Sequence, residues 1–385
     1  MKMINAWTLE LDTPEAAVAE ILEQLDLENN LLSNAAGFIT CSYDFIETGM
    51  VKAICEALPF EVSGCTTFTN ATNEESGSML LCLTVLTADD CSFATALSPV
   101  LSGDITEHLT NTYDEAAAKL DSPPKLVLAF VPMMQSLGGG LIIQALNKAA
   151  QGPPIFGTTA CDFDTAHYTH SYTLYNGQHL REQLSMLLIA GNVQPHFVVT
   201  ATSEQNLRKQ QAVITDSEGS ILKAVNGMST RSYLESIGLI QGGSEKGLSS
   251  VPFMVNYNDG TQPLARAIYS LSDDGSALCG GLMPKGSTLS IGRMDVEDIL
   301  LSAEQSLKRI LDFEGICGII TFPCLGRNLI LGMDFLREIE QVQKHVPKSL
   351  PVHLAYSGGE VCPVYDGNGN AVNRFHNFTF IACAL

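Results

Sequence analysis

Residues 125–160, KLVLAFVPMMQSLGGGLIIQALNKAAQGPPIFGTTA, contain an apolar strand, a helical segment and a second apolar strand. Apolar side chains run almost continuously up to Pro132, and after the three glycines they recur at helical spacing. The same order of strand, helix and strand returns at residues 35–67 and 315–360. Such alternation is typical of parallel sheets that are covered by helices. We therefore predict an α/β fold in which repeated strand–helix–strand units form largely parallel sheets.

The chain changes character after the second of these units. Residues 185–193, SMLLIAGNV, and 196–202, HFVVTAT, are strand-like, and turn signals follow at 272–275 and 284–286. This pattern predicts added antiparallel β-hairpins in the C-terminal half.

We place a domain boundary within this strand-rich region, between residues 225 and 226. The two predicted domains are residues 1–225 and residues 226–385. Each is long enough to enclose a core of its own.

The composition argues against two classes of partner. The 385 residues include 42 acidic and 21 basic side chains, which gives a formal net charge of −21. An acidic surface repels phosphate backbones and anionic lipid, so we expect no nucleic-acid partner. No apolar run approaches the roughly 20 residues that a membrane-spanning helix needs, so we also expect no membrane insertion.

The N-terminus and the cysteines predict a cytoplasmic protein. The N-terminus becomes acidic within ten residues and has no apolar signal-peptide core. Thr13 and Pro14 then begin a predicted helix that continues to about Leu25. The eleven cysteines form no C-x-x-C pair, and several lie within apolar runs. They are interpreted as small buried hydrophobic residues in a reducing compartment, without a zinc site.

Small-residue loops follow three of the predicted strands, at residues 64–67 (GCTT), 157–159 (GTT) and 357–360 (SGGE). Ligands in open α/β sheets bind beyond the carboxyl ends of the strands. Glycine lets a ligand approach the main chain, and hydroxyl groups offer hydrogen bonds. The alternative is that these loops are only tight turns. The predicted ligand-binding residues here are Gly64, Cys65, Thr66, Thr67, Gly157, Thr158, Gly359 and Glu360.

Two further segments are candidates for the same cavity, residues 323–328 (PCLGRN) and 374–379 (RFHNFT). The planar guanidinium of Arg327 could hold a ligand carboxylate, or it could tie the loop to an acid such as Glu338. A histidine before a terminal strand is more often a structural hydrogen-bonding residue than a ligand. The predicted site also includes Cys324, Arg327, Asn328, His376 and Asn377.

Several catalytic and cofactor signatures are missing from the sequence. It contains no phosphate-binding P-loop, no G-x-G-x-x-G fingerprint and no G-x-S-x-G elbow. Residues 162–170, DFDTAHYTH, place two acids before two histidines, but their Thr and Tyr content favours a polar loop over a helical metal site. We therefore expect no bound metal.

The order of these motifs resembles the FIST domains. The N-terminal part of the resemblance is carried by GCTT at 64–67, PIFG at 154–157 and VNG at 225–227. The C-terminal part, which is more specific, is carried by MPKGS at 283–287, PCLGR at 323–327, YSGGEVCP at 356–363 and FHNFT at 375–379. The resemblance extends over roughly residues 30 to 385.

The resemblance implies a function in sensing. FIST domains are regarded as intracellular sensory modules that bind small ligands such as amino acids or their derivatives. Residues 1–225 are then a FIST N-terminal-like domain and residues 226–385 a FIST C-terminal-like domain. We expect a stand-alone form that acts through a separate signalling protein.

Three ligand chemistries remain open at this point. Arg327 and Glu360 could hold the carboxylate and the ammonium of an amino acid. Some bacterial FIST members resemble haem-binding nitric oxide sensors, and a non-covalent haem here would take His376, His353 or Cys324 as its axial ligand. A thiol-dependent enzyme that uses Cys65 is the third alternative, and enzymatic activity is left open. No cofactor is otherwise expected.

Overall fold

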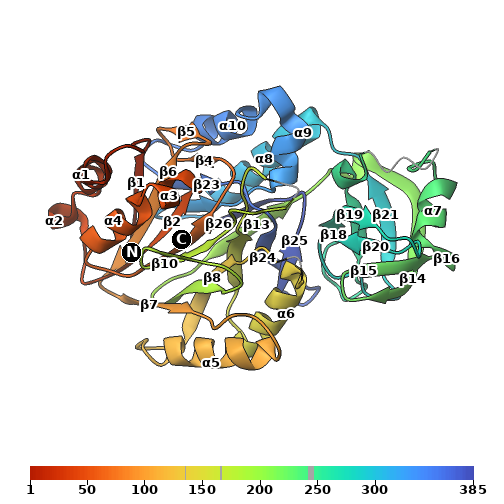
Figure 1. Ribbon diagram of the computed structural model, residues 1–385, viewed down its shortest axis with the longest axis horizontal. Coiled ribbons are helices and arrows are strands. Elements are labelled where there is room, and N and C mark those ends of the chain that lie inside the picture. The colour runs from red at the N-terminus through yellow and green to blue at the C-terminus, as the bar shows by residue number, and fades with distance from the viewer. Residues whose placement is uncertain (135, 165–166, 242–246) are drawn as a thin grey trace.

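The protein is a mixed α/β molecule with four β-sheets (Figure 1). The computed structural model describes residues 1–134, 136–164, 167–241 and 247–385. Three six-stranded sheets and their helices form the body, and an eight-stranded sheet forms a smaller part on the right of Figure 1. The predicted α/β class is confirmed at this level.

The first sheet has the strand order β1-β6-β2-β3-β10-β11. Helix α1 packs on it with Ala17, Ile21 and Leu25 buried at helical spacing. Its strands are β1 (Lys2–Thr8), β2 (Asn34–Cys41), β3 (Val62–Thr66), β6 (Leu81–Ala88), β10 (Thr173–Tyr175) and β11 (Gln178–Leu180). Its helices are α1 (Pro14–Leu25), α2 (Leu27–Asn30), α3 (Asp44–Glu47) and α4 (Met50–Ala57).

The second sheet has the order β25-β24-β9-β8-β12-β7 and lies above α5 and α6 in Figure 1. Its strands are β7 (Cys91–Leu97), β8 (Pro124–Val131), β9 (Ile155–Thr159), β12 (Ser185–Gly191), β24 (Glu360–Tyr365) and β25 (Ala371–His376). Its helices are α5 (Ile105–Ala117), which Asp104 caps, and α6 (Gly139–Ala150).

The third sheet has the order β13-β26-β22-β23-β4-β5. Its strands are β4 (Asn70–Ala71), β5 (Ser76–Gly77), β13 (His196–Thr200), β22 (Ile319–Thr321), β23 (Val352–Ala355) and β26 (Phe380–Ala384). The helices beside it are α8 (Val296–Leu311), α9 (Leu325–Leu331), η3 (Gly332–Asp334) and α10 (Arg337–His345). Because β4 and β5 precede residue 80, chain segments from both ends of the sequence build this sheet.

One core joins the three sheets of the body. Phe38 of β2, Phe130 of β8, Phe156 of β9 and Ile320 of β22 are buried together in it. Since each residue comes from a sheet that could not bury this face alone, the three sheets form one body.

The smaller part is an antiparallel module, which we define as residues 207–292. Its strands are β14 (Leu207–Glu218), β15 (Ile221–Val225), β16 (Met228–Ser229), β17 (Phe253–Asn256), β18 (Leu264–Arg266), β19 (Ile268–Leu271), β20 (Ala277–Cys279) and β21 (Thr288–Gly292). Short helices at or near it are η1 (Glu204–Asn206), α7 (Thr230–Ser236) and η2 (Leu248–Ser250). Its main core is separate from that of the body, and a smaller apolar cluster, in which Met254 and Ala265 of the module pack with Ile299 and Leu331, joins the two parts.

The prediction of largely parallel sheets is wrong in its detail. Parallel pairing is restricted to β2–β3, β8–β9 and β22–β23 among the named strands of the described chain, and each pair is linked through helices. The other ladders of the body are antiparallel, including β6, β12 and β26 beside the first strand of each pair. A strand that is buried on both faces has the same apolar sequence whichever way its neighbour runs, so the sequence pattern did not distinguish the two cases.

The boundary between residues 225 and 226 stays a prediction. Strands from both predicted domains pair within the second and third sheets. No helix among those that the structure describes is long and apolar enough to span a membrane.

Candidate functional site

The three small-residue loops lie together at the strand ends. The Cys161 N–H donates to the Thr66 carbonyl over 3.0 Å, which joins the first loop to the second. Thr159 and Gly358 are joined by a main-chain bond of 3.0 Å, which links the second loop to the third. A bond of 3.4 Å from the Phe68 N–H to the Tyr356 carbonyl joins the first loop to the third. The structure therefore brings together the loops that were singled out separately in the sequence.

Two of the predicted glycines are required for strand packing. A Cβ atom on Gly64 would lie 2.0 Å from the carbonyl oxygen of Ile39, and one on Gly157 would lie 1.9 Å from that of Ala129. The partners are the paired residues on the neighbouring parallel strands. The close approach of two main chains explains both glycines without a ligand.

The hydroxyl groups of Thr66, Thr67 and Thr158 bond to other protein groups, whereas that of Thr159 is buried and has no partner among the described residues. Thr158 Oγ1 donates to Ser357 Oγ over 2.7 Å, and Thr67 Oγ1 donates to Asn70 Oδ1 over 2.7 Å. Thr66 Oγ1 accepts the Tyr172 N–H at 2.9 Å. These hydrogen bonds hold the loops in place, as the alternative interpretation of the loops as tight turns requires. Contact of these residues with a ligand stays a prediction.

Cys65 is placed where a nucleophile would be unreactive. Its side chain is fully buried in the core of the body, together with Phe38 and Phe130. Burial raises the pKa of the Cys65 thiol well above its usual value. Because the thiolate is the reactive form, this environment argues against the enzyme alternative that relies on Cys65.

Arg327 has a protein partner. It is fully buried, and its Nε donates to Glu338 Oε1 over 3.0 Å within a buried ion pair. The Tyr356 hydroxyl donates to the other oxygen of Glu338 at 2.8 Å, and Arg327 Nη2 also donates to Ser302 Oγ at 2.9 Å. The structure thus assigns Arg327 the role of tying its loop to Glu338, and its guanidinium is not available to clamp a ligand carboxylate. Beside it, the Asn328 amide bonds the Phe335 carbonyl.

Glu360 differs from Arg327 because one of its oxygens lacks a partner. Its Oε2 accepts the Thr379 hydroxyl at 2.7 Å and the Thr379 N–H at 3.2 Å. Its Oε1 is buried and has no hydrogen-bond partner among the residues that the structure describes. Desolvation raises the pKa of Glu360 to about 8, although the bonds from Thr379 and the nearby Cys324 thiol oppose the shift. At neutral pH the carboxyl is therefore mostly protonated.

Five further side chains lie near this carboxyl or next to its neighbours: Cys161, Tyr269 and Cys324 interact electrostatically with Glu360, Tyr168 with Cys161 and Cys324, and Asn377 with Tyr269. We call the group the Glu360 cluster; it consists of Cys161, Tyr168, Tyr269, Cys324, Glu360 and Asn377. Burial is the main cause that raises the pKa of the Cys324 thiol, and the neighbouring Glu360 adds to it. The predicted residues Cys324, Glu360 and Asn377 are thus neighbours in space.

Cys161, Tyr168 and Tyr269 are the members of the cluster that the predicted site residues did not include. Tyr168 follows the second loop with a φ of +52°, and Tyr269 comes from β19 of the antiparallel module. Desolvation raises the pKa of Tyr269, to which Tyr168 and Glu360 contribute by proximity, while a hydrogen bond with Asn377 lowers it. Tyr269 nevertheless keeps 52% of its surface exposed, so part of this side chain is in contact with solvent. No short motif marks either tyrosine.

The antiparallel module docks on the body beside the cluster. The Ala267 N–H donates to Asn377 Oδ1 over 3.4 Å, and Arg266 Nη1 donates to the Phe375 carbonyl over 2.9 Å. Gly280 packs so closely on Asn377 that a Cβ there would lie 2.4 Å from its Oδ1. The cluster is therefore shared between the module and the body.

The two histidines proposed as haem ligands are both fully buried. His353 uses both ring nitrogens, one with Thr40 Oγ1 and one with Thr84 Oγ1, each over 2.8 Å. His376 Nε2 bonds the Cys362 carbonyl at 2.9 Å, while its Nδ1 has no partner in the described part of the chain. Burial lowers the pKa of both to about 3, so they stay neutral. Haem binding stays a prediction.

The loop at residues 162–170 forms a network of its own. Asp164 accepts the His167 Nδ1 at 3.2 Å and the Thr169 hydroxyl at 3.0 Å, and Asp162 accepts the His170 N–H. No group of three or more metal-ligating side chains was found in the ranges that the structure describes, which leave out residues 165–166 of this loop.

Comparison with known families matches both halves of the chain. The FIST N domain matches residues 35–228, and the FIST C domain matches residues 231–363. Five of the six members of the Glu360 cluster lie within these two matches: Cys161, Tyr168, Tyr269, Cys324 and Glu360. No curated protein matches the chain.

Proposed function

Because the chain belongs to the FIST family, whose domains are associated with sensing in signal transduction, we propose that it is a sensory protein for a small amine. The ligand would bind at the Glu360 cluster through an ammonium group. Amino acid derivatives and other small polar metabolites with an amine are the class that this site would select.

The observation that carries the proposal is the unpartnered oxygen of Glu360. A fully buried carboxyl with one free oxygen is costly unless another group satisfies it. An ammonium ion supplies both the missing hydrogen bond and the compensating charge.

The rest of the cluster supports a cation over an anion. Its polar members are two tyrosine hydroxyls, two thiols, a carboxyl and an amide; the basic side chain near Glu360 is Arg327, whose charge favours the ionised carboxyl but which is itself paired with Glu338. Aromatic rings attract cations, and the net charge of −21 raises the local concentration of cations around the molecule. Because Arg327 is paired with Glu338, amines without a carboxylate should bind at least as well as amino acids.

Proton release gives the proposal a specific signature. Glu360 is protonated in the free protein below a pKa of about 8, and an ammonium ligand requires its ionised form. The affinity should therefore rise by up to about tenfold for each pH unit between pH 6 and 8, while the amine itself remains charged.

We would test this by titration calorimetry with ethanolamine, putrescine and the common amino acids at pH 6, 7 and 8. The expected result is binding that strengthens with pH and releases a proton to the buffer. Glu360→Gln should abolish it, while the matched control Glu56→Gln, on an exposed position of α4, should leave it unchanged. Absence of binding for all amines, or equal binding by Glu360→Gln, would contradict the proposal.

We also propose that the protein works in the cytoplasm and signals through a separate protein. All eleven cysteines are free, including pairs that lie in the same buried cores. A chain that carries this many free thiols is suited to a reducing compartment.

A further inference from the structure

Strand β1 has a free edge beside a surface groove. It is the outermost strand of the first sheet and pairs with β6 on one side only. On its other side, the Trp7 N–H donates to Gln24 Oε1 over 2.9 Å, and the Trp7 carbonyl accepts Gln24 Nε2 at 2.7 Å. The Gln24 amide thus bonds to Trp7 as the peptide group of a neighbouring strand would.

The same edge continues at two residues before Trp7, of which Asn5 is half-buried and Met3 is 4% exposed. Main-chain groups alternate along a strand, so the N–H and C=O of Met3 and Asn5 point to the same side as those of Trp7. The described residues give these groups no hydrogen-bond partner, since β6 takes the groups of the intervening residues. An edge with free main-chain donors and acceptors is a template for a further strand.

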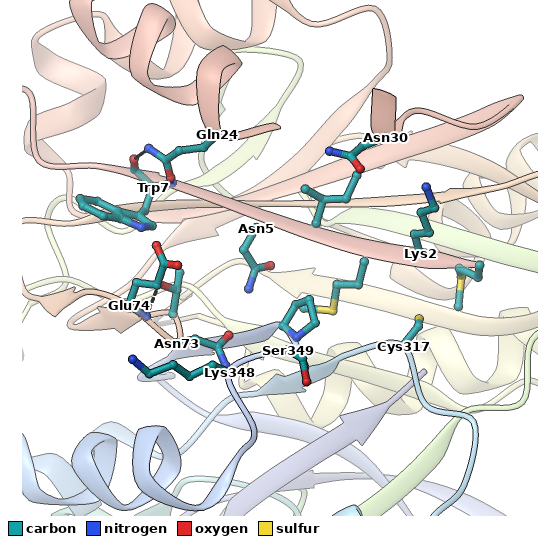
Figure 2. Close-up of a pocket in the computed structure, with 15 residues that line it drawn as sticks. Lys2, Asn5, Trp7, Gln24, Asn30, Asn73, Glu74, Cys317, Lys348 and Ser349 are labelled. Carbon is teal, nitrogen blue, oxygen red and sulfur yellow. Dashed lines mark hydrogen bonds between the residues drawn. The ribbon is translucent and has the colours of Figure 1, made fainter. Parts of the chain in front are cut away.

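A groove of about 630 Å³ runs along this edge (Figure 2). Figure 2 shows β1 crossing the view with Asn73, Lys348 and Ser349 on the opposite side. The two sides are fixed relative to each other, because Asn5 Nδ2 donates to the Val352 carbonyl and the Val352 N–H donates to Asn73 Oδ1, each over 2.7 Å. The groove is therefore formed before any partner arrives.

The charge of the groove differs from that of the whole molecule. Lys2 and Lys348 line it and are exposed, and Glu74 is the acidic side chain in its lining. The chain as a whole carries a net charge of −21. Local positive charge on an acidic protein favours an acidic partner, and it disfavours symmetric pairing of this edge with the same edge of a second copy, which would bring the lysines together.

We propose that this groove binds an extended acidic segment of a partner protein, which adds to the first sheet as a strand beside β1. Main-chain bonds to Met3 and Asn5 provide the affinity, and Lys2 and Lys348 select acidic side chains. The surface is independent of the Glu360 cluster and provides the separate signalling protein with a place to dock.

The single tryptophan of the chain gives a direct readout. Trp7 lies at the end of the groove, and no other residue contributes indole fluorescence. The probe is a peptide of about seven residues that alternates valine and glutamate and contains no aromatic residue. Titration should shift the Trp7 emission to saturation, and exchanging the glutamates for lysines should weaken binding by roughly tenfold or more at low salt.

N-methylation of the peptide tests strand addition itself. Methyl groups on one set of alternate amides should abolish binding, and those on the other set should be tolerated, because only alternate N–H groups of a strand face β1. Equal loss with both sets, or equal binding of the glutamate and lysine peptides, would overturn the proposal.

Charge variants provide the matched protein controls. The double variant Lys2→Glu with Lys348→Glu should lose roughly tenfold in affinity for the glutamate peptide. Lys285→Glu, an exposed charge in the module, and Glu360→Gln should both bind it normally, which separates this test from that of the amine site. Sedimentation without peptide tests the alternative occupant: a dimer that Lys2→Glu with Lys348→Glu abolishes would overturn the proposal in favour of pairing between copies.

Discussion

Glu360 should make the stability of the protein depend on pH even without a ligand. Its pKa is about 8 in the folded state against 4.5 as a model value, so between these values the folded state holds a proton that the unfolded state has lost. The contribution to stability is therefore fully present below pH 4.5 and is lost as the pH rises through 8. By pH 8 the loss is on the order of 4 kcal/mol.

Glu360→Gln keeps the shape of the protonated carboxyl and removes this titration. We expect the free energy of unfolding of the wild type to fall, relative to that of the variant, between pH 5 and 8. Urea unfolding of both proteins at several pH values measures the difference between their free energies of unfolding. The titration of all other groups is common to both proteins and cancels in this difference. Parallel curves for the two proteins would mean that Glu360 is ionised in the folded state.

Residue roles at the site could be predicted only in part from the sequence. Cys324, Glu360 and Asn377 belong to motifs, and the structure places them together. Glu338 was named from the sequence as the alternative partner of Arg327, and the structure confirms this pairing. The choice between Glu338 and a ligand carboxylate depended on the fold, because only the packing of α10 buries Glu338 beside Arg327. Tyr269 reaches the cluster from another sheet, a contact that arises only from the tertiary fold.

At the scale of elements, local signals were more reliable than pairing signals. Thr13 and Pro14 predicted the start of a helix that ends near Leu25, and α1 spans Pro14–Leu25 with Thr13 as its N-cap. Capping is decided by a few adjacent residues. The direction of a neighbouring strand is decided by chain connectivity, and for this reason the antiparallel position of β6, β12 and β26 was not predicted.

The close approach of paired strands at Gly64 and Gly157 gives a prediction at this scale. Gly157→Ala should place a Cβ 1.9 Å from the Ala129 carbonyl oxygen, and Gly64→Ala should place one 2.0 Å from that of Ile39. Neither main chain can yield without breaking its ladder, so each variant should lose about 3 kcal/mol or more. Gly367→Ala, with nothing within 4 Å of its new Cβ, is the matched control.

Thermal unfolding of the three variants tests this interpretation. Melting temperatures should fall steeply for Gly64→Ala and Gly157→Ala and stay within a few degrees of the wild type for Gly367→Ala. If the first two variants were stable but had lost amine binding, the glycines would instead serve the ligand, as the sequence first indicated.

At the scale of the whole molecule, the antiparallel module has a main core of its own and is joined to the body beside the site by a smaller shared apolar cluster. Arg266 is buried at this contact with neutral partners: the Leu282 and Phe375 carbonyls and the Tyr257 hydroxyl, among others. A buried cation that is held by carbonyl groups of both parts favours one fixed docking position. Since Tyr269 belongs to the module and Glu360 to the body, docking and ligand binding should depend on each other.

The variant Gly280→Ala tests this coupling. The new Cβ would lie 2.4 Å from Asn377 Oδ1, so either the Asn377 side chain must turn away from Ala267 or the module must move away from the body at this point. We expect amine affinity to fall at least about tenfold. The Ala267 amide, which donates to Asn377 Oδ1, should exchange hydrogen faster, while amides of β2 and β8 should keep their protection.

Hydrogen exchange followed by mass spectrometry, with and without ethanolamine, measures both effects. Bound amine should slow exchange at residues 264–271 of the wild type and should do so less in Gly280→Ala. Gly77→Ala, whose Cβ meets nothing closer than 3.9 Å, controls for the substitution itself. If Gly280→Ala binds amines normally while Ala267 exchanges faster, the module does not contribute to the site, and Tyr269 only covers the cluster.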